Sequence, residues 1–129
     1  MTAIDRITTP NAPKPAGHYS QACGYDGLIF VSGQLPVSLE GKVLADRSFD
    51  EQVRVALGNV LAILKEAESG PERVLKVTAF IVGVENWPAF NRIYAELFGD
   101  SRPARSVVPV PSLHHGCLIE IEAVAARGA

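Results

Sequence analysis

The segment from Cys117 to Ala125 constrains the fold more strongly than any other part of this 129-residue chain. Its odd positions are all apolar, whereas two of its even positions are glutamates, Glu120 and Glu122. Because successive side chains of a strand point to opposite faces, this alternation predicts a β-strand with one face in a core. The two glutamates then point the same way, roughly 7 Å apart. Their neighbours on that face are apolar, so each carboxylate needs a partner or a ligand, unless the face is simply solvated.

The first helix signal begins at a capping box, in which Ser48 precedes Glu51 by three residues. The apolar residues that follow recur at spacings of three and four, and they therefore share one helix face. They are Val53, Leu57, Val60, Leu61 and Leu64. Ser69-Gly70-Pro71 ends this helix, because glycine and proline are typical of helix C-termini.

A second helix is predicted to begin at Asn86, as its N-cap, with Pro88 in the first turn. Its buried stripe has the same spacing as the first and consists of Phe90, Ile93, Tyr94, Leu97 and Phe98. Gly99 follows this stripe and suits the C-terminal cap.

Strand signals flank both helices. Tyr19 to Gly24 and Leu28 to Gln34 are joined by Asp26-Gly27, a pair typical of tight hairpin turns. Val74 to Ile81 and Ser106 to Val110 are rich in β-branched residues. This order predicts an α+β domain with two helices packed on one face of a mixed sheet. The opposite face carries many apolar residues, so we expect another subunit to cover it.

The length predicts a single domain over residues 1–129, with residues 1–16 as an extended arm that contains three prolines. A net charge of −2 argues against nucleic acid as the main partner, because phosphate binding relies on clustered Lys and Arg. No long uncharged apolar run occurs, so we expect neither a membrane partner nor a signal peptide. Cys23 and Cys117 are too few for a disulfide framework and are expected to be free thiols of a cytoplasmic protein.

Arg105 follows Pro103-Ala104 at the start of a strand-like segment. A guanidinium fork binds a carboxylate through two parallel hydrogen bonds, and a nearby glutamate can act as a general base. We therefore expect Arg105 to pair with a strand glutamate such as Glu120 while its fork stays open for an organic anion. A surface arginine in a structural ion pair is the alternative.

Tyr19 and Ser32 are candidate ligand-binding residues, because they lie near glycines such as Gly33 that let a ligand approach the backbone. Packing in the core or in an interface is the alternative for Tyr19. Two further residues, His114 and His115, are adjacent and therefore point apart. Since no HExxH or paired CxxC pattern occurs either, we expect no metal site.

Six short segments, taken in order, resemble the signatures of the Rid family (the reactive intermediate deaminases), also called the YjgF family. The resemblance extends from about residue 10 to about residue 126. The segments are Gly17-His18-Tyr19-Ser20-Gln21-Ala22, Val31-Ser32-Gly33-Gln34-Leu35-Pro36, Val77-Thr78-Ala79-Phe80, Phe90-Asn91-Arg92-Ile93-Tyr94, Pro103-Ala104-Arg105-Ser106 and Ile119-Glu120-Ile121-Glu122-Ala123. No single segment is decisive, but their order is specific.

This resemblance implies a chorismate-mutase-like α+β fold, assembled as a homotrimer with ligand pockets in the clefts between subunits. It also implies a hydrolase that converts reactive enamine and imine acids, such as 2-aminoacrylate and 2-iminopropionate, to a 2-keto acid and ammonia. The family needs no metal or organic cofactor for this reaction.

The resemblance further implies roles for individual positions. Arg105 matches the arginine that holds the substrate carboxylate, and Glu120 matches the acid that orients or activates water. The positions that match residues around the substrate are Tyr19, Ser32, Gly33, Asn91 and Val107. Val107 stands where several members carry cysteine.

Two departures from the family pattern change the rim of the pocket and leave the preferred substrate open. His18 replaces a proline, and Leu113-His114-His115-Gly116 replaces a different loop. A related deaminase of another amino substrate, such as an aminomuconate-type intermediate, is therefore an alternative. A regulatory trimer that binds small carboxylates through Arg105 without turnover is a second alternative. The ribonuclease role attached to some relatives is a third alternative, and the acidic pI argues against it.

Overall fold

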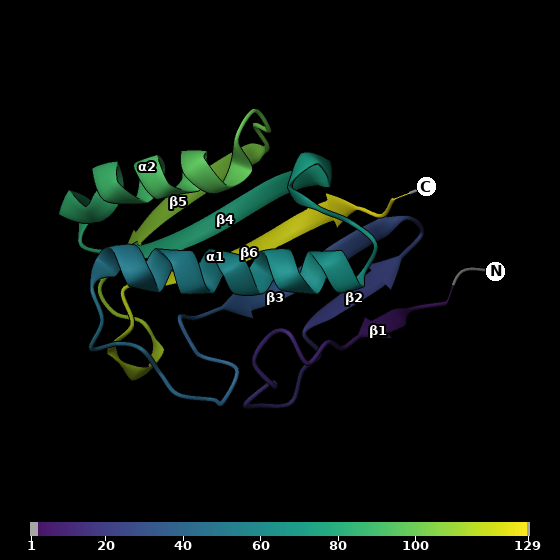
Figure 1. Ribbon diagram of the computed structural model, residues 1–129, viewed down its shortest axis with the longest axis horizontal. Helices are drawn as coiled ribbons and strands as arrows, with labels where there is room; N and C mark the ends of the chain where they lie inside the picture. The colour runs from purple at the N-terminus through teal and green to yellow at the C-terminus, as the bar shows by residue number, and fades with distance from the viewer. Residues whose placement is uncertain (1–2, 129) are drawn as a thin grey trace.

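The computed structural model describes residues 3–128 and contains a six-stranded mixed sheet with two helices on one face (Figure 1). The strands are β1 (Asp5–Ile7), β2 (Ala22–Tyr25), β3 (Leu28–Gln34), β4 (Val74–Val82), β5 (Ala104–Val110) and β6 (Ile119–Ala126). The helices are α1 (Phe49–Glu66) and α2 (Trp87–Phe98), and three short 3-10 turns are η1 (Pro71–Arg73), η2 (Val84–Asn86) and η3 (His114–Gly116). None of the helices in residues 3–128 is long and apolar enough to span a membrane.

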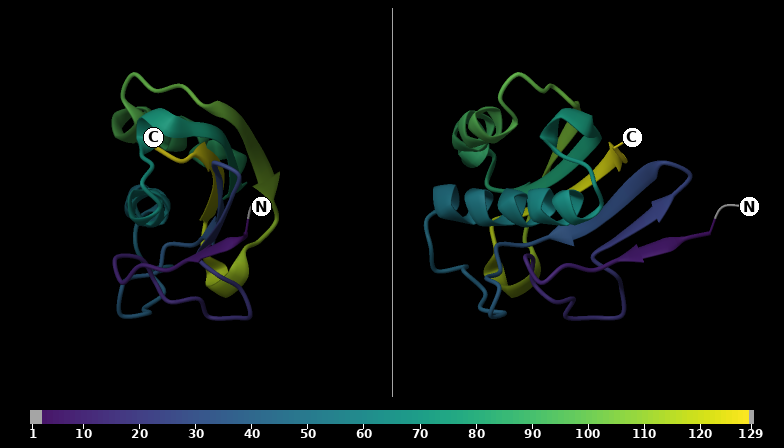
Figure 2. Two further views of the ribbon diagram at one scale, coloured as in Figure 1. Left: turned by 90° about the vertical axis from the view of Figure 1, so that its right-hand side faces the viewer. Right: turned by 45° about the vertical axis from the view of Figure 1, so that its right-hand side comes forward.

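The sheet order is β1-β2-β3-β6-β4-β5, and every neighbouring pair is antiparallel except β4 and β5. A parallel pair needs a crossover connection, which α2 provides. α1 connects β3 to β4 and packs on the same side as α2, so that the sheet has one covered and one uncovered face (Figure 2). The predicted α+β class, with two helices on one face of a mixed sheet, is confirmed.

α1 buries the face that its sequence pattern predicts. Leu57 and Leu64 are fully buried in the core, whereas Leu61 lies at the margin of the stripe and is half-buried. The N-cap is Ser48, as predicted, and its Oγ accepts a hydrogen bond from the Glu51 N–H at 3.2 Å. This bond gives one of the otherwise unpaired amides of the first turn an acceptor.

Replacing Ser48 with alanine removes that acceptor. We expect Ser48→Ala to lower the free energy of unfolding by about 1 kcal/mol. Urea denaturation of the two proteins measures the difference, and alanine at the exposed Ser112 is the control, with no expected change. Equal midpoints for Ser48→Ala and the native protein would contradict the assigned cap.

α2 confirms part of its predicted boundaries. Pro88 occupies the first turn, and Gly99 ends the helix with a left-handed φ of 60°. Asn86 stands at the N-cap position, but its side chain does not cap the helix. It already has a helical backbone conformation because it closes η2, and its Nδ2 donates to the Val82 carbonyl at 3.0 Å. The predicted capping role of Asn86 is therefore wrong.

The N-terminal arm is attached to the domain between residues 5 and 13. Asp5–Ile7 forms β1 and pairs with β2. The buried side chain of Gln21 accepts a hydrogen bond from the Thr9 N–H at 2.7 Å and donates to three carbonyls of the arm. β2 consequently begins at Ala22, and Tyr19, which the sequence pattern places in this strand, lies in the loop before it.

The uncovered face of the sheet is rich in apolar side chains. Phe30 is 46% exposed and Val108 is 37% exposed, and both lie on the face opposite the helices. Tyr25 and Leu28 extend this apolar area across the β2–β3 hairpin. An apolar area of this kind is typical of subunit interfaces. That another subunit covers it remains a prediction.

Candidate functional site

The register of the sheet places the two predicted catalytic side chains on opposite faces, because residues paired across a ladder point to the same side. Arg105 pairs with Val77, which pairs with Ala123, and both partners are buried beneath the helices. Glu120 pairs with Phe80 on the uncovered face. Within residues 3–128 of one protomer, Arg105 has no carboxylate within 4.0 Å. The expected ion pair of Arg105 with a strand glutamate is therefore wrong for a single chain.

Arg105 lies on the edge strand β5 and is held by side chains of α2. Its Nη1 donates a hydrogen bond to Oδ1 of Asn91 at 3.0 Å. Its guanidinium carbon lies 4.9 Å from the ring centroid of Tyr94 and 5.6 Å from that of Phe90. The side chain is nevertheless exposed and lines a hollow of about 410 Å³ together with Asn91 and Tyr94. A cation fixed in this way and free of acidic partners is suited to bind an anion.

Val107 faces the same way as Arg105, two residues further along β5. It is half-buried and packs against the core, so its side chain serves packing. Because β5 is the last strand of the sheet, one side of its backbone has no strand partner among the described residues.

Glu120 lies half-buried on β6, against the backbone of Gly33 on β3. A Cβ on Gly33 would lie 2.7 Å from Oε2 of Glu120, so the glycine is what allows this close approach. Burial raises the pKa of Glu120, and the charge of Glu122 raises it further, whereas His114 lowers it. A carboxyl group with a raised pKa exchanges its proton closer to neutral pH, as a general base requires.

A cleft of about 330 Å³ opens in front of Glu120. Lys14 and Tyr19 line it from the N-terminal segment, and His114 and His115 line it from η3. The expectation that these two side chains point apart is wrong: their ring centroids lie 3.8 Å apart, because His115 adopts a left-handed φ of 60° that breaks the usual alternation. In the part of the chain that the structure describes, no group of three or more potential ligand side chains could hold a metal ion.

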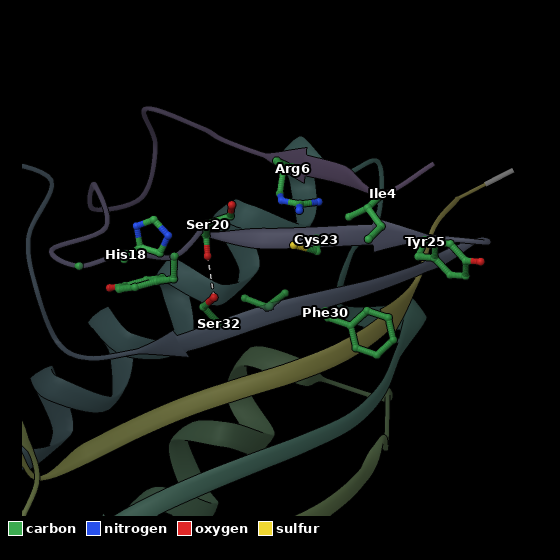
Figure 3. Close-up of a pocket in the computed structure, with 11 residues that line it drawn as sticks. Ile4, Arg6, His18, Ser20, Cys23, Tyr25, Phe30 and Ser32 are labelled. Atoms are coloured by element: carbon green, nitrogen blue, oxygen red, sulfur yellow. Dashed lines mark hydrogen bonds between the residues drawn. The ribbon is translucent and has the colours of Figure 1, made fainter. Parts of the chain in front are cut away.

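Tyr19 and Ser32 lie beside a second, wider hollow, which opens on β2 and β3 (Figure 3). Ser32 Oγ donates a hydrogen bond to the carbonyl of Ser20 at 2.6 Å and so anchors the loop that carries Tyr19. Tyr19 is 52% exposed and lines both this hollow and the cleft of Glu120. Packing in the protomer core is thereby excluded for Tyr19. His18 lines the same hollow.

The predicted site residues thus form two separate groups. The Arg105 group, at the outer edge of the sheet beneath α2, consists of Arg105, Asn91 and Val107. The Glu120 group, around the cleft and the neighbouring hollow, consists of Glu120, Gly33, Tyr19 and Ser32. Sequence reasoning assigned Tyr94 to the core stripe only and missed its contact with the guanidinium. Its spacing of three from Asn91 is the signal that could have found it.

The close approach of Gly33 and Glu120 can be tested directly. We expect Gly33→Ala to displace the carboxylate toward solvent, which lowers the pKa of Glu120 toward its ordinary value. The displaced atoms lie at the far end of the flexible Glu120 side chain. The free energy of unfolding should therefore change by less than about 1 kcal/mol. NMR titration of the Glu120 carboxyl measures the pKa.

The matched control is Gly58→Ala on α1, where an added Cβ meets no atom within 4 Å. This control should stabilise the protein by roughly 1 kcal/mol and leave the pKa of Glu120 unchanged. An unaltered Glu120 titration in Gly33→Ala would contradict the contact.

Comparison with known proteins extends over nearly the whole chain. A family model described as Endoribonuclease L-PSP matches residues 9–127. A RutC family protein of Pyrococcus abyssi is 40% identical over 123 residues, which cover 95% of this chain and 97% of that protein. The crystal structure of YyfA from Yersinia pestis, a member of the conserved Rid protein family, has a TM-score of 0.92 at 38% identity and covers 96% of this chain and 99% of its own. TdcF from E. coli, solved with bound serine, has a TM-score of 0.90 at 32% identity with the same coverage. The predicted resemblance is confirmed, and the chain belongs to the Rid family, also called the YjgF family.

Proposed function

We propose that this protein is a hydrolytic deaminase of 2-imino and 2-enamino acids, such as 2-iminopropionate and 2-aminoacrylate, and releases a 2-keto acid and ammonia. The observation that carries the proposal is the state of Arg105. Its guanidinium is fixed by Asn91 and by the ring of Tyr94, has no acidic partner in residues 3–128, and borders a hollow. Such a fork is complementary to the carboxylate that these substrates share.

The proposal requires two copies of the chain, because Arg105 and Glu120 lie on opposite faces of one sheet. The uncovered apolar face and the unpaired edge of β5 support assembly of copies. We propose a homotrimer in which the Arg105 group of one subunit faces the Glu120 group of the next. Light scattering should then give three times the 13.8 kDa mass of one chain.

In the proposed reaction the substrate carboxylate binds Arg105 through two hydrogen bonds. Glu120 accepts a proton from water while the water oxygen bonds to the imine carbon, and the C=N electron pair moves to the nitrogen, which takes a proton from solvent. In the resulting carbinolamine, Glu120 returns its proton to the amine and the C–N bond breaks. The hydroxyl group loses its proton to solvent as the C=O bond forms, which gives the keto acid and ammonia. Tyr19, Ser32 and Gly33 border the space around the reacting group. The substrates are already reactive, so positioning and a general base worth about 10²–10⁴-fold are sufficient.

The bound serine of TdcF supports the substrate class, because serine is a small 2-amino carboxylate like the proposed substrates. The name of the matching family model points instead to ribonuclease activity. We place RNA outside the proposed substrates, because the chain has a net charge of −2 and phosphate binding relies on clustered positive charge. We propose a cytoplasmic location on the basis of the two free thiols, Cys23 and Cys117.

A coupled assay tests the function. A pyridoxal-dependent dehydratase acting on serine generates 2-aminoacrylate, and pyruvate and ammonia are followed with and without the protein. We expect the protein to accelerate pyruvate formation in proportion to its concentration. A correctly assembled protein without any acceleration would refute the proposed turnover.

A second candidate is a related deaminase with another amino substrate, and the cleft of Glu120 favours it. Lys14, His114 and His115 add basic side chains to this cleft, which suits a substrate with a further acidic group. A panel of imines, generated by an amino acid oxidase from neutral and acidic amino acids, separates the two. Binding of keto acids without ammonia release from any of them would instead identify the non-catalytic carboxylate-binding trimer.

A further inference from the structure

We propose that Tyr94 is a positioning residue for Arg105: its ring is the platform that fixes the guanidinium plane and leaves the outer edge of the fork free for a carboxylate. This inference rests on the proposed function only in taking a small carboxylate as the ligand.

The ring of Tyr94 is itself immobilised. The side chain is 7% exposed and lies between two other aromatic residues of α2, with centroid distances of 4.5 Å to Phe98 and 5.4 Å to Phe90. Spacings of four along a helix stack side chains on one face, so this row follows directly from the sequence. The guanidinium carbon of Arg105 lies 4.9 Å from the Tyr94 centroid, nearer than to Phe90. A cation at this distance from a fixed ring is held by the negative charge of the ring face.

A ring differs from a carboxylate as a partner for arginine in a way that matters for function. A carboxylate would occupy two donors of the fork and compensate the charge. The rings occupy none of the donors, and Asn91 accepts from Nη1 alone. The guanidinium is thereby oriented while its charge and its other donors remain available to an anion.

The proposed role of Tyr94 does not depend on its hydroxyl group. It is buried and has no hydrogen-bond partner among the described residues. Burial raises the pKa of Tyr94 to about 12, although the positive charge of Arg105 lowers it in part. The phenol therefore stays neutral. A buried, unpaired hydroxyl destabilises the protein, and phenylalanine at this position should therefore preserve the platform.

Three variants separate the platform from ordinary packing. Tyr94→Leu removes the ring, Tyr94→Phe removes only the hydroxyl, and Phe49→Leu removes a half-buried core ring on α1 that does not line the hollow of Arg105. Calorimetry with pyruvate as the probe measures carboxylate affinity, and the coupled assay measures KM and kcat.

We expect Tyr94→Leu to weaken pyruvate binding about tenfold, with a matching rise in KM and a smaller change in kcat. Tyr94→Phe should bind pyruvate like the native protein and melt at the same temperature or higher. Phe49→Leu should melt at a lower temperature but bind pyruvate normally. Unchanged affinity in Tyr94→Leu, or equal losses in Tyr94→Phe and Tyr94→Leu, would overturn the proposal.

A measurement on the native protein does not depend on any variant folding. The Cδ protons of Arg105 should show upfield NMR shifts from the ring current of Tyr94, and ordinary shifts would overturn the platform. Failure of the proposed function is distinguishable: Tyr94-dependent pyruvate binding without turnover refutes the deaminase but sustains the platform. Turnover that does not depend on Tyr94 supports the deaminase and refutes the platform. Absence of any carboxylate binding refutes both.

Discussion

Arg105→Ala should lower kcat/KM for 2-aminoacrylate by about 10²–10⁴-fold. Two hydrogen bonds to a charged partner contribute about 1.5–3 kcal/mol each, and every 1.36 kcal/mol of transition-state stabilisation is a factor of ten in rate. Most of the loss should appear in KM, because the carboxylate is bound in the ground state as well. The coupled dehydratase assay measures both constants.

The native fold should survive this change, because Arg105 is exposed and carries no structural ion pair in residues 3–128. Arg105→Lys should recover only part of the activity, since an ammonium keeps the charge but cannot present two parallel donors. The control is Arg54→Ala on α1, which removes an exposed ion pair with Glu96 at 2.8 Å and should leave kcat/KM unchanged. Full activity in Arg105→Ala would rule out the carboxylate clamp.

Glu120→Gln should lower kcat by about 10²–10⁴-fold, the range typical of a lost general base. The amide keeps the shape of the side chain but accepts no proton from water. In the native protein, kcat should rise with pH as the Glu120 carboxyl ionises. Because the pKa of this group is raised, kcat should increase at a pH above the ordinary range of carboxyl pKa values.

The same substitution should increase stability at neutral pH. The folded protein holds the Glu120 proton more tightly than the unfolded chain does, because burial disfavours the charged form. The contribution of the neutral Glu120 carboxyl to folding stability is therefore fully present below the pKa that this group has in the unfolded chain. It is lost as the pH rises through the higher pKa that the group has in the folded protein. Thermal melts should show Glu120→Gln above the native protein at pH 7, and the gap should narrow at acidic pH.

Glu122→Gln is the matched control on the same face of β6. It should keep most of the activity, since Glu122 is exposed and does not line the cleft. Because the charge of Glu122 raises the pKa of Glu120, the rise of kcat should move to lower pH in this variant. Equal losses from the two glutamine substitutions, or an active Glu120→Gln, would contradict the assignment of the base.

Patterns within single segments predicted the elements well. The alternation along Cys117 to Ala125 predicted β6, and the stripe from Val53 to Leu64 predicted the buried face of α1. The predictions failed where a neighbour in space competes for the same group. Asn86 donates to the Val82 carbonyl instead of capping α2, and the loop of Tyr19 follows the arm that Gln21 holds.

In the candidate site, too, the sequence identified single residues but not all of their contacts in space. The resemblance to the Rid family named Arg105 and Asn91, and the structure places them in contact at 3.0 Å. The partnership of Tyr94 with Arg105 was missed, because a buried aromatic in an amphipathic stripe is most simply explained by core packing. The close approach of Gly33 to Glu120 likewise depends on how β3 and β6 lie against each other.

The sequence alone determined which residues share a face within each strand and helix, because side-chain direction repeats every two residues in a strand and every 3.6 in a helix. It determined in this way that Glu120 and Glu122 point together and that α1 and α2 each bury one stripe. Only the tertiary structure decided that Arg105 and Glu120 face opposite sides of the sheet. The reason is that the relative orientation of two strands depends on the register of the ladders between them, here through β4, and no periodicity inside either strand contains that register.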